Sequence, residues 1–296
     1  MAPLLRQIVL LALGSSVVAG APPDPEAATA DAIMAKVAAH TSAATEARRQ
    51  YLYQQKVRAS MSQTDGELLR RENREYRVVP EESTTVKTLL SLTGEYRDGK
   101  RLVPYGQSDR SDKRDHADRD TIQPLVDALV NVKDSRDGIP HTLFPLRSDD
   151  VAYYKFTLKG ETTLLGRRAY HILFEPANTQ DLCVHVGGDE GNTCHQWKGE
   201  AFIDVEEYQP VSIQTHLAKA IPWGVRVFMG IDVRQYGFSI DYQRVAENVW
   251  FPKSYGTEFR FTVFWGYKRT VTLSLENQDF RKTDASSTVH FDQPTN

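Results

Sequence analysis

The sequence predicts an α+β protein built on one strongly curved antiparallel sheet, with two helices over its concave face. Most of the chain is a long series of short segments in which apolar and polar residues alternate, separated by turn sequences. Only two segments show helical periodicity, which is too few for the crossovers of a parallel sheet. A sheet with this many strands is expected to curl or close rather than stay flat.

The N-terminus predicts export. Within residues 1–21, a positive Arg6 precedes an apolar stretch from Ile8 to Val18, and small residues follow as far as Ala21. This stretch is shorter than the roughly 20 apolar residues of a membrane span, and the order of features is that of a signal peptide. An uncleaved N-terminal anchor is the alternative. We therefore expect residues 22–296 to form a single mature domain in the periplasm.

Composition excludes several classes of function. The formal net charge is −3 over 296 residues, which argues against a general nucleic-acid-binding surface. No segment after the signal peptide is apolar enough to cross a bilayer. The sequence holds no nucleophile elbow, phosphate-binding loop or His-Glu-x-x-His motif, and its eight histidines share no pattern. We expect neither catalytic residues nor a cofactor.

The first predicted helix covers residues 24–47, an Ala-rich stretch in which Ile33, Met34 and Val37 recur at helical spacing. It is weakly apolar and should lie on a surface.

The second predicted helix follows a run of mixed charges over residues 108–120, which we interpret as a solvated loop. Asp120 would cap this helix, with Gln123 completing a capping box, and the helix would run to Val132. Its apolar face has the i, i+3, i+4, i+7 spacing and consists of Ile122, Leu125, Val126 and Leu129.

Strands account for the rest. Asp65-Gly66 predicts the first hairpin turn because both residues tolerate positive φ. We expect strands over residues 50–61, 67–79, 84–96, 152–160, 161–166, 168–175, 199–205, 211–215, 228–244, 249–256, 257–264 and 268–277.

The two cysteines, Cys183 and Cys194, leave three alternatives open. An exported chain meets an oxidising compartment, which favours a disulfide between them. Two thiolates with His185 and His195 could instead hold zinc tetrahedrally. Two free thiols are the third alternative.

Three segments carry a resemblance to a known family. They are residues 199–211 (GEAFIDVEEYQPV), 249–255 (VWFPKSY) and 273–282 (LSLENQDFRK). Together with the leading helix after a signal peptide, they resemble the outer-membrane lipoprotein-sorting (LolA-like) superfamily. The resemblance implies a half-open antiparallel barrel with helices over its mouth, and carriage or sensing of lipid or lipoprotein acyl chains in the periplasm without catalysis. This chain is longer, and it adds the charged run and the cysteine loop.

Two functions from different classes follow. In the first, the protein is a carrier that holds acyl chains against the concave face, and the second helix is its lid, with Ile122, Leu125, Val126 and Leu129 as ligand-binding residues. In the second, the core is filled, and the protein is a structural or interaction component of the envelope that binds other envelope proteins through exposed strands or loops.

Overall fold

The computed structural model describes residues 29–81, 84–107, 116–130, 135–139, 151–178, 197–218, 237–263 and 267–283. The predicted signal peptide, Cys183, Cys194 and the first half of the expected strand 228–244 lie outside these ranges.

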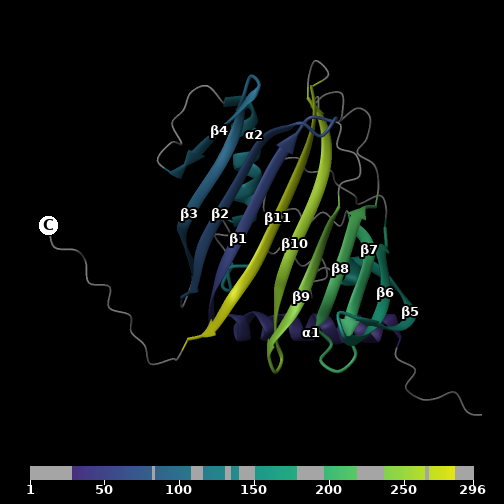
Figure 1. Ribbon diagram of the computed structural model, residues 1–296. Helices are drawn as coiled ribbons and strands as arrows, with labels where there is room; N and C mark the ends of the chain where they lie inside the picture. Colours follow the sequence, from purple (N-terminus) through teal and green to yellow (C-terminus); the bar gives the residue numbers. More distant parts are fainter. Residues whose placement is uncertain are drawn as a thin grey trace, which may run out of the picture.

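Eleven strands form one sheet in the order β4-β3-β2-β1-β11-β10-β9-β8-β7-β6-β5, and each strand is antiparallel to its neighbours (Figure 1). The sheet is open, with β4 and β5 at its edges. This agrees with the predicted curved half-barrel, and bulges in several strand pairs supply points where the sheet can bend. The strands are β1 Tyr51–Ser62, β2 Leu68–Pro80, β3 Thr85–Asp98, β4 Arg101–Gly106, β5 Tyr154–Leu164, β6 Arg167–Pro176, β7 Trp197–Asp204, β8 Pro210–Leu217, β9 Phe238–Ala246, β10 Val249–Val263 and β11 Tyr267–Lys282.

Two expected strand breaks do not occur. Residues 152–160 and 161–166 give the single strand β5 after a short 3-10 helix, η3 (Val151–Tyr153), and residues 249–264 give the single strand β10. Gly160 adopts φ +131° beside a bulge, so the strand bends there without ending. Gly256 pairs with Ser274 on one side and Ser239 on the other, so the ladder continues through it. A glycine in a strand is therefore not by itself a strand end.

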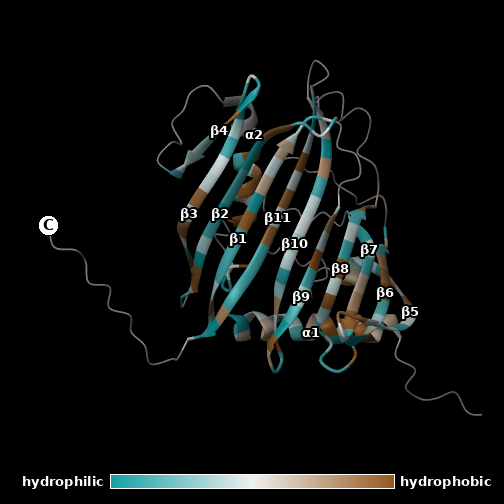
Figure 2. Ribbon diagram, viewed as in Figure 1, coloured by the Kyte–Doolittle hydropathy of each residue, from teal (hydrophilic) through white to brown (hydrophobic). Residues whose placement is uncertain are grey.

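One face of the sheet is buried, and we call it the inner face. On β1 the buried residues alternate with less buried ones, and Tyr53, Val57 and Met61 lie on the inner face. Figure 2 shows hydrophobic and hydrophilic residues alternating along the strands. One register row of the inner face is apolar across eight strands; this apolar row consists of Leu158, Ile172, Ala201, Ile213, Ile240, Tyr255, Leu275 and Val57.

Helix α1 (Ala30–Arg48) begins at its N-cap Thr29, whose hydroxyl accepts from the Ala32 amide at 3.2 Å. Ile33, Met34 and Val37 are buried, and the helix packs against β10, β5 and η3. In Figure 1 it lies behind the lower end of the sheet.

Helix α2 (His116–Val130) packs against β1 and β2. It begins earlier than expected, so residues 116–120 of the predicted solvated loop are helical. Pro124 lies inside the helix and has no amide hydrogen to donate to the Asp120 carbonyl, so the first turns lack one helical hydrogen bond. Among the described residues, no helix is both long and apolar enough to cross a membrane.

Candidate functional site

The apolar row ends at β2, where the inner face becomes charged. Arg74 lies directly opposite Val57, and its side chain is 3% exposed. Glu72 and Arg70 follow at alternate positions on the same face, opposite Ala59 and Met61, and both are buried. An apolar strip on β1 therefore lies beside a charged strip on β2, at the usual strand spacing of about 4.8 Å.

We call the five residues Arg70, Glu72, Arg74, Tyr105 and Asp127 the charged cluster. Glu72 is its centre: Oε2 accepts from the Tyr105 hydroxyl at 2.7 Å, and Oε1 accepts from Arg74 Nε. Arg70 forms an ion pair with Glu72 at 3.5 Å, and its guanidinium carbon lies 4.6 Å from the centroid of the Tyr105 ring. Two strands, β2 and β4, thus contribute side chains to one buried polar assembly.

The fifth member comes from α2. Asp127 Oδ1 lies 2.8 Å from Arg74 Nη1, and the side chains of Asp127 and Arg74 are 40% and 3% exposed. Arg74 thus binds Glu72 on its own strand through Nε and Asp127 of α2 through Nη1. An ion pair therefore links α2 to the inner face of the sheet.

The electrostatics fix the protonation states of the cluster. Burial alone would raise the pKa of Glu72, but the hydrogen bond from Tyr105 and the charges of Arg74 and Arg70 outweigh it, and the pKa is lowered. Burial and the Glu72 carboxylate raise the pKa of Tyr105 well above its ordinary value. Glu72 therefore remains an anion and Tyr105 a hydrogen-bond donor at neutral pH.

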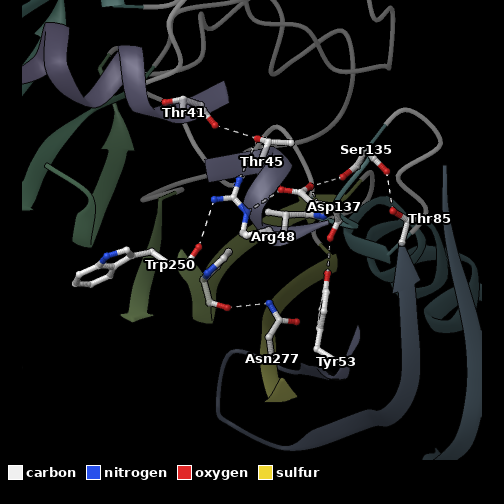
Figure 3. A network of polar contacts seen from close by, with 11 residues as sticks. Thr41, Thr45, Arg48, Tyr53, Thr85, Ser135, Asp137, Trp250 and Asn277 are labelled. Atoms are coloured by element: carbon white, nitrogen blue, oxygen red, sulfur yellow. Dashed lines mark hydrogen bonds and ion pairs between the residues drawn. The ribbon is translucent and has the colours of Figure 1, made fainter. Parts of the chain in front are cut away.

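A second network ties the segment after α2 to α1 and the sheet (Figure 3). Arg48 Nε donates to Asp137 Oδ2 at 2.8 Å, and Ser135 Oγ donates to Asp137 Oδ1 at 2.8 Å. The Tyr53 hydroxyl donates to the Asp137 carbonyl at 3.0 Å, and Thr85 Oγ1 donates to the Ser135 carbonyl at 3.0 Å. Tyr53 and Arg74 both lie on the inner face. Because Tyr53 contacts the segment bound to Arg48 of α1, and Arg74 contacts Asp127 of α2, both helices meet that face.

A half-buried lysine, Lys87, lies near Asp137 of the second network. Lys87 Nζ donates to Gln55 Oε1 at 3.2 Å, and Gln55 Nε2 donates to Asn277 Oδ1 at 3.1 Å. Burial lowers the pKa of Lys87 to about 8, with the nearby Asp137 carboxylate acting in the opposite direction. Nothing in this chain of contacts resembles a catalytic pair, since amides flank the amine.

The Asp-containing turn of the family resemblance has a structural role. Asp204 Oδ1 accepts from the amides of Glu206 and Glu207 at 3.0 and 2.8 Å, and Oδ2 accepts from Arg167 Nε at 2.6 Å. The Glu207 carbonyl lies 3.2 Å from His40 Nδ1 of α1. The turn between β7 and β8 thus holds α1 against the end of the sheet.

The outer face carries a shallow pocket of about 270 Å³ on β5 to β8. Its charged lining mixes signs and includes Lys155, Glu175, Lys198 and Glu200. His216 also lines it, but among the described residues no group of three or more His, Cys, Asp or Glu could hold a metal ion. The cations and anions of this pocket balance one another, so it selects no ligand charge.

Of the predicted lid residues, Ile122, Val126 and Leu129 are buried and Leu125 is half-buried against the core. The predicted cysteine pair lies outside the described residues. Sequence reasoning missed the charged cluster altogether. Both faces of β2 are polar in sequence, so alternation could not show that Arg70, Glu72 and Arg74 face inward.

No protein-family model matches the sequence, and no curated protein matches it. Among solved structures, a LolA superfamily protein from Nitrosomonas europaea is 12% identical, with 87% of this chain and 95% of that chain covered and a TM-score of 0.33. A putative outer membrane lipoprotein-sorting protein domain from Vibrio parahaemolyticus is 8% identical, with 86% and 95% covered and a TM-score of 0.35. A DUF1329 family protein from Desulfovibrio piger is 9% identical, with 88% and 95% covered and a TM-score of 0.36.

The Pseudomonas aeruginosa MucA/MucB complex also matches, at 12% identity, with 84% of this chain and 99% of that chain covered and a TM-score of 0.23. Proteins of the expected LolA superfamily are thus among the solved structures to which this chain is similar, with most of the chain covered. None of these similarities assigns a ligand or a partner to this chain.

Proposed function

We propose that this chain is a non-catalytic periplasmic carrier that holds acyl chains of lipids or lipoproteins against the inner face of its sheet, with α2 as a movable lid. In this proposal the inner face is the concave face of the half-barrel. The apolar row carries the proposal: it runs without a polar side chain on its inner-face positions from β5 to β1, except for the Tyr255 hydroxyl.

An acyl chain gains about 0.8 kcal/mol for each methylene that it buries, and such burial has no directional requirement. A continuous apolar surface that crosses many strands suits a ligand of this kind. The α2 residues Ile122, Val126 and Leu129 are buried, and α2 packs against β1, where the apolar row ends. Lid and ligand would therefore compete for one apolar surface.

The experiment uses Leu129→Glu, which places a charge on the buried side of α2. If α2 is a lid, this variant loosens it and changes the binding of a fluorescent fatty acid, while thermal melting shows the sheet still folded. Gln123→Glu is the matched control, because it adds the same charge at a half-buried position of the same helix. A large loss of melting temperature, with no fatty-acid binding by either the variant or the original chain, would overturn the carrier function.

One observation favours the second candidate, a protein-interaction component of the envelope. β4 pairs only with residues 93–98 of β3, so in the described part of the chain no strand pairs with residues 85–92 on that side. Val86 and Leu90 on this free edge are 41% and 40% exposed. An extended segment of a partner could add to this edge as a further strand.

Mass spectrometry of organic extracts of the purified protein distinguishes the two. Recovered acyl chains support the carrier. An extract without acyl chains supports the second candidate on one further condition. An envelope protein must associate with the original chain, and Leu90→Lys must abolish that association.

A further inference from the structure

We propose that the charged cluster binds the head group of the carried lipid, and that this head group is an anionic carboxylate or phosphate. The inference rests on the proposed function and names the chemical class of its ligand.

Placement is the first argument. Arg74, Glu72 and Arg70 lie directly opposite Val57, Ala59 and Met61, so the last apolar strand and the charged strand are adjacent. An amphiphile whose tail lies along the apolar row would reach β2 with its head group. Burying charged side chains costs free energy, so a surface that served only for packing would avoid them. Here charged side chains are buried at the end of the apolar row.

The partners of Arg74 are the second argument. Arg74 binds the Glu72 carboxylate through Nε and the Asp127 carboxylate of α2 through Nη1. When the lid moves away, Asp127 leaves with it and Nη1 loses its carboxylate. An anionic head group can replace that carboxylate, whereas a neutral or cationic one cannot. In the closed protein, Asp127 occupies the place of the head group.

The geometry of the arginine is the third argument. Arg74 Nη1 meets Asp127 Oδ1 at 2.8 Å, while Nε is bound to Glu72 within the sheet. Glu72 is itself fixed by the Tyr105 hydroxyl at 2.7 Å, so the guanidinium is held in one orientation. A guanidinium is well suited to carboxylate and phosphate oxygens because its donors form a planar fork. Glu72 and Tyr105 are positioning residues for Arg74.

Displacement of an uncharged fluorescent probe, N-phenyl-1-naphthylamine, tests the inference. The competitors share one chain length and differ in head group: dodecanoate, dodecyl phosphate and dodecanol. We expect at least one of the two anions to displace the probe at roughly tenfold lower concentration than dodecanol, as for a charge-assisted hydrogen bond. Whichever anion is preferred identifies the head group as carboxylate or phosphate.

Two variants should change the preference for anions over dodecanol in opposite directions. Arg74→Gln should bring the anions to the level of dodecanol, while Asp127→Asn should increase the preference because Arg74 Nη1 loses its carboxylate partner. Arg71→Gln is the control: it removes the same charge from the outer face of the same strand, where the side chain is 56% exposed. It should leave the preference unchanged.

The outcomes separate the two proposals. Absence of probe binding overturns the carrier function and this inference with it. Displacement by all three competitors at equal concentrations leaves the carrier function standing and overturns the inference. If melting shows that Arg74→Gln does not fold, Asp127→Asn decides, and an unchanged anion preference in that variant overturns the inference.

Discussion

The ring of Tyr105 lies directly across the Cα of Gly94, and a Cβ added to Gly94 would fall 2.2 Å from Tyr105 Cζ. The two residues are register partners on β4 and β3. Because Gly94 has no side chain, the Tyr105 ring can cross β3 and its hydroxyl can reach Glu72 on β2 at 2.7 Å. The charged cluster therefore depends on a glycine that contributes no side chain to it.

Gly94→Ala should displace Tyr105 and leave Glu72 without its hydroxyl donor. We expect a loss of about 1–3 kcal/mol in the free energy of unfolding, measured by urea denaturation. Tyr105→Phe separates the two causes, because it removes the hydroxyl and keeps the ring. An alanine variant as stable as the original chain would contradict the structure around Gly94.

Lys87 should make the protein more stable as the pH rises from about 8 towards 10.5. Its pKa is about 8 in the folded state, against an ordinary value of 10.5, so in this window the unfolded state binds more protons. Below pH 8 both states are protonated, and the folded state carries the cost of holding a charge at a half-buried position. Lys87→Met should remove this dependence between pH 7 and pH 10 in urea titrations; an unchanged slope would show that Lys87 does not cause it.

Asp204 should contribute stability that disappears in acid. Burial would raise its pKa, but Arg167 and the amides of Glu207 and Glu206 outweigh burial and lower it below 3.8. The contribution is present above that ordinary value and is lost as pH falls through the lower folded pKa. Asp204→Asn should cost about 1–2 kcal/mol at pH 7 and weaken the acid dependence in calorimetry. Glu206→Gln, at a side chain 76% exposed, should change little.

Cys183 and Cys194 should be bonded to each other in the exported protein. Closing this short loop would stabilise the chain by about 2–3 kcal/mol in the chain-entropy model. Thiol labelling of denatured, unreduced protein should detect almost no free thiol. Full labelling at both positions, or one bound zinc per chain, would refute the disulfide.

The mature protein should begin close to Pro22, because the small residues Ala19 and Ala21 suit signal peptidase. N-terminal sequencing of protein recovered from the cell envelope measures this directly. Intact Met1 in the membrane fraction would show an uncleaved anchor instead.

Local patterns in the sequence were sufficient for both helices and most of the strands, although they missed β4 and divided β5 and β10 in two. Alternation placed β1 and β2 to within a residue or two, and Asp65-Gly66 marked the turn between them. Helical spacing identified Ile122, Val126 and Leu129 as one face of a helix, and all three are buried. Short-range periodicity carries this information because it records which side of an element meets water.

Tertiary structure alone decided the pairing of β1 with β11, in which Tyr51 meets Lys282. No local signal links segments so far apart, because a turn specifies only neighbouring strands. Local signals also could not show which face of β2 is buried, because polar residues occupy both of its faces. Arg70, Glu72 and Arg74 face inward because their partners on β1, Met61, Ala59 and Val57, face inward. The sequence by itself determined both helices and most of the strands; only the packing of distant segments decided which polar side chains are buried together, because burial depends on neighbours in space that a local pattern does not identify.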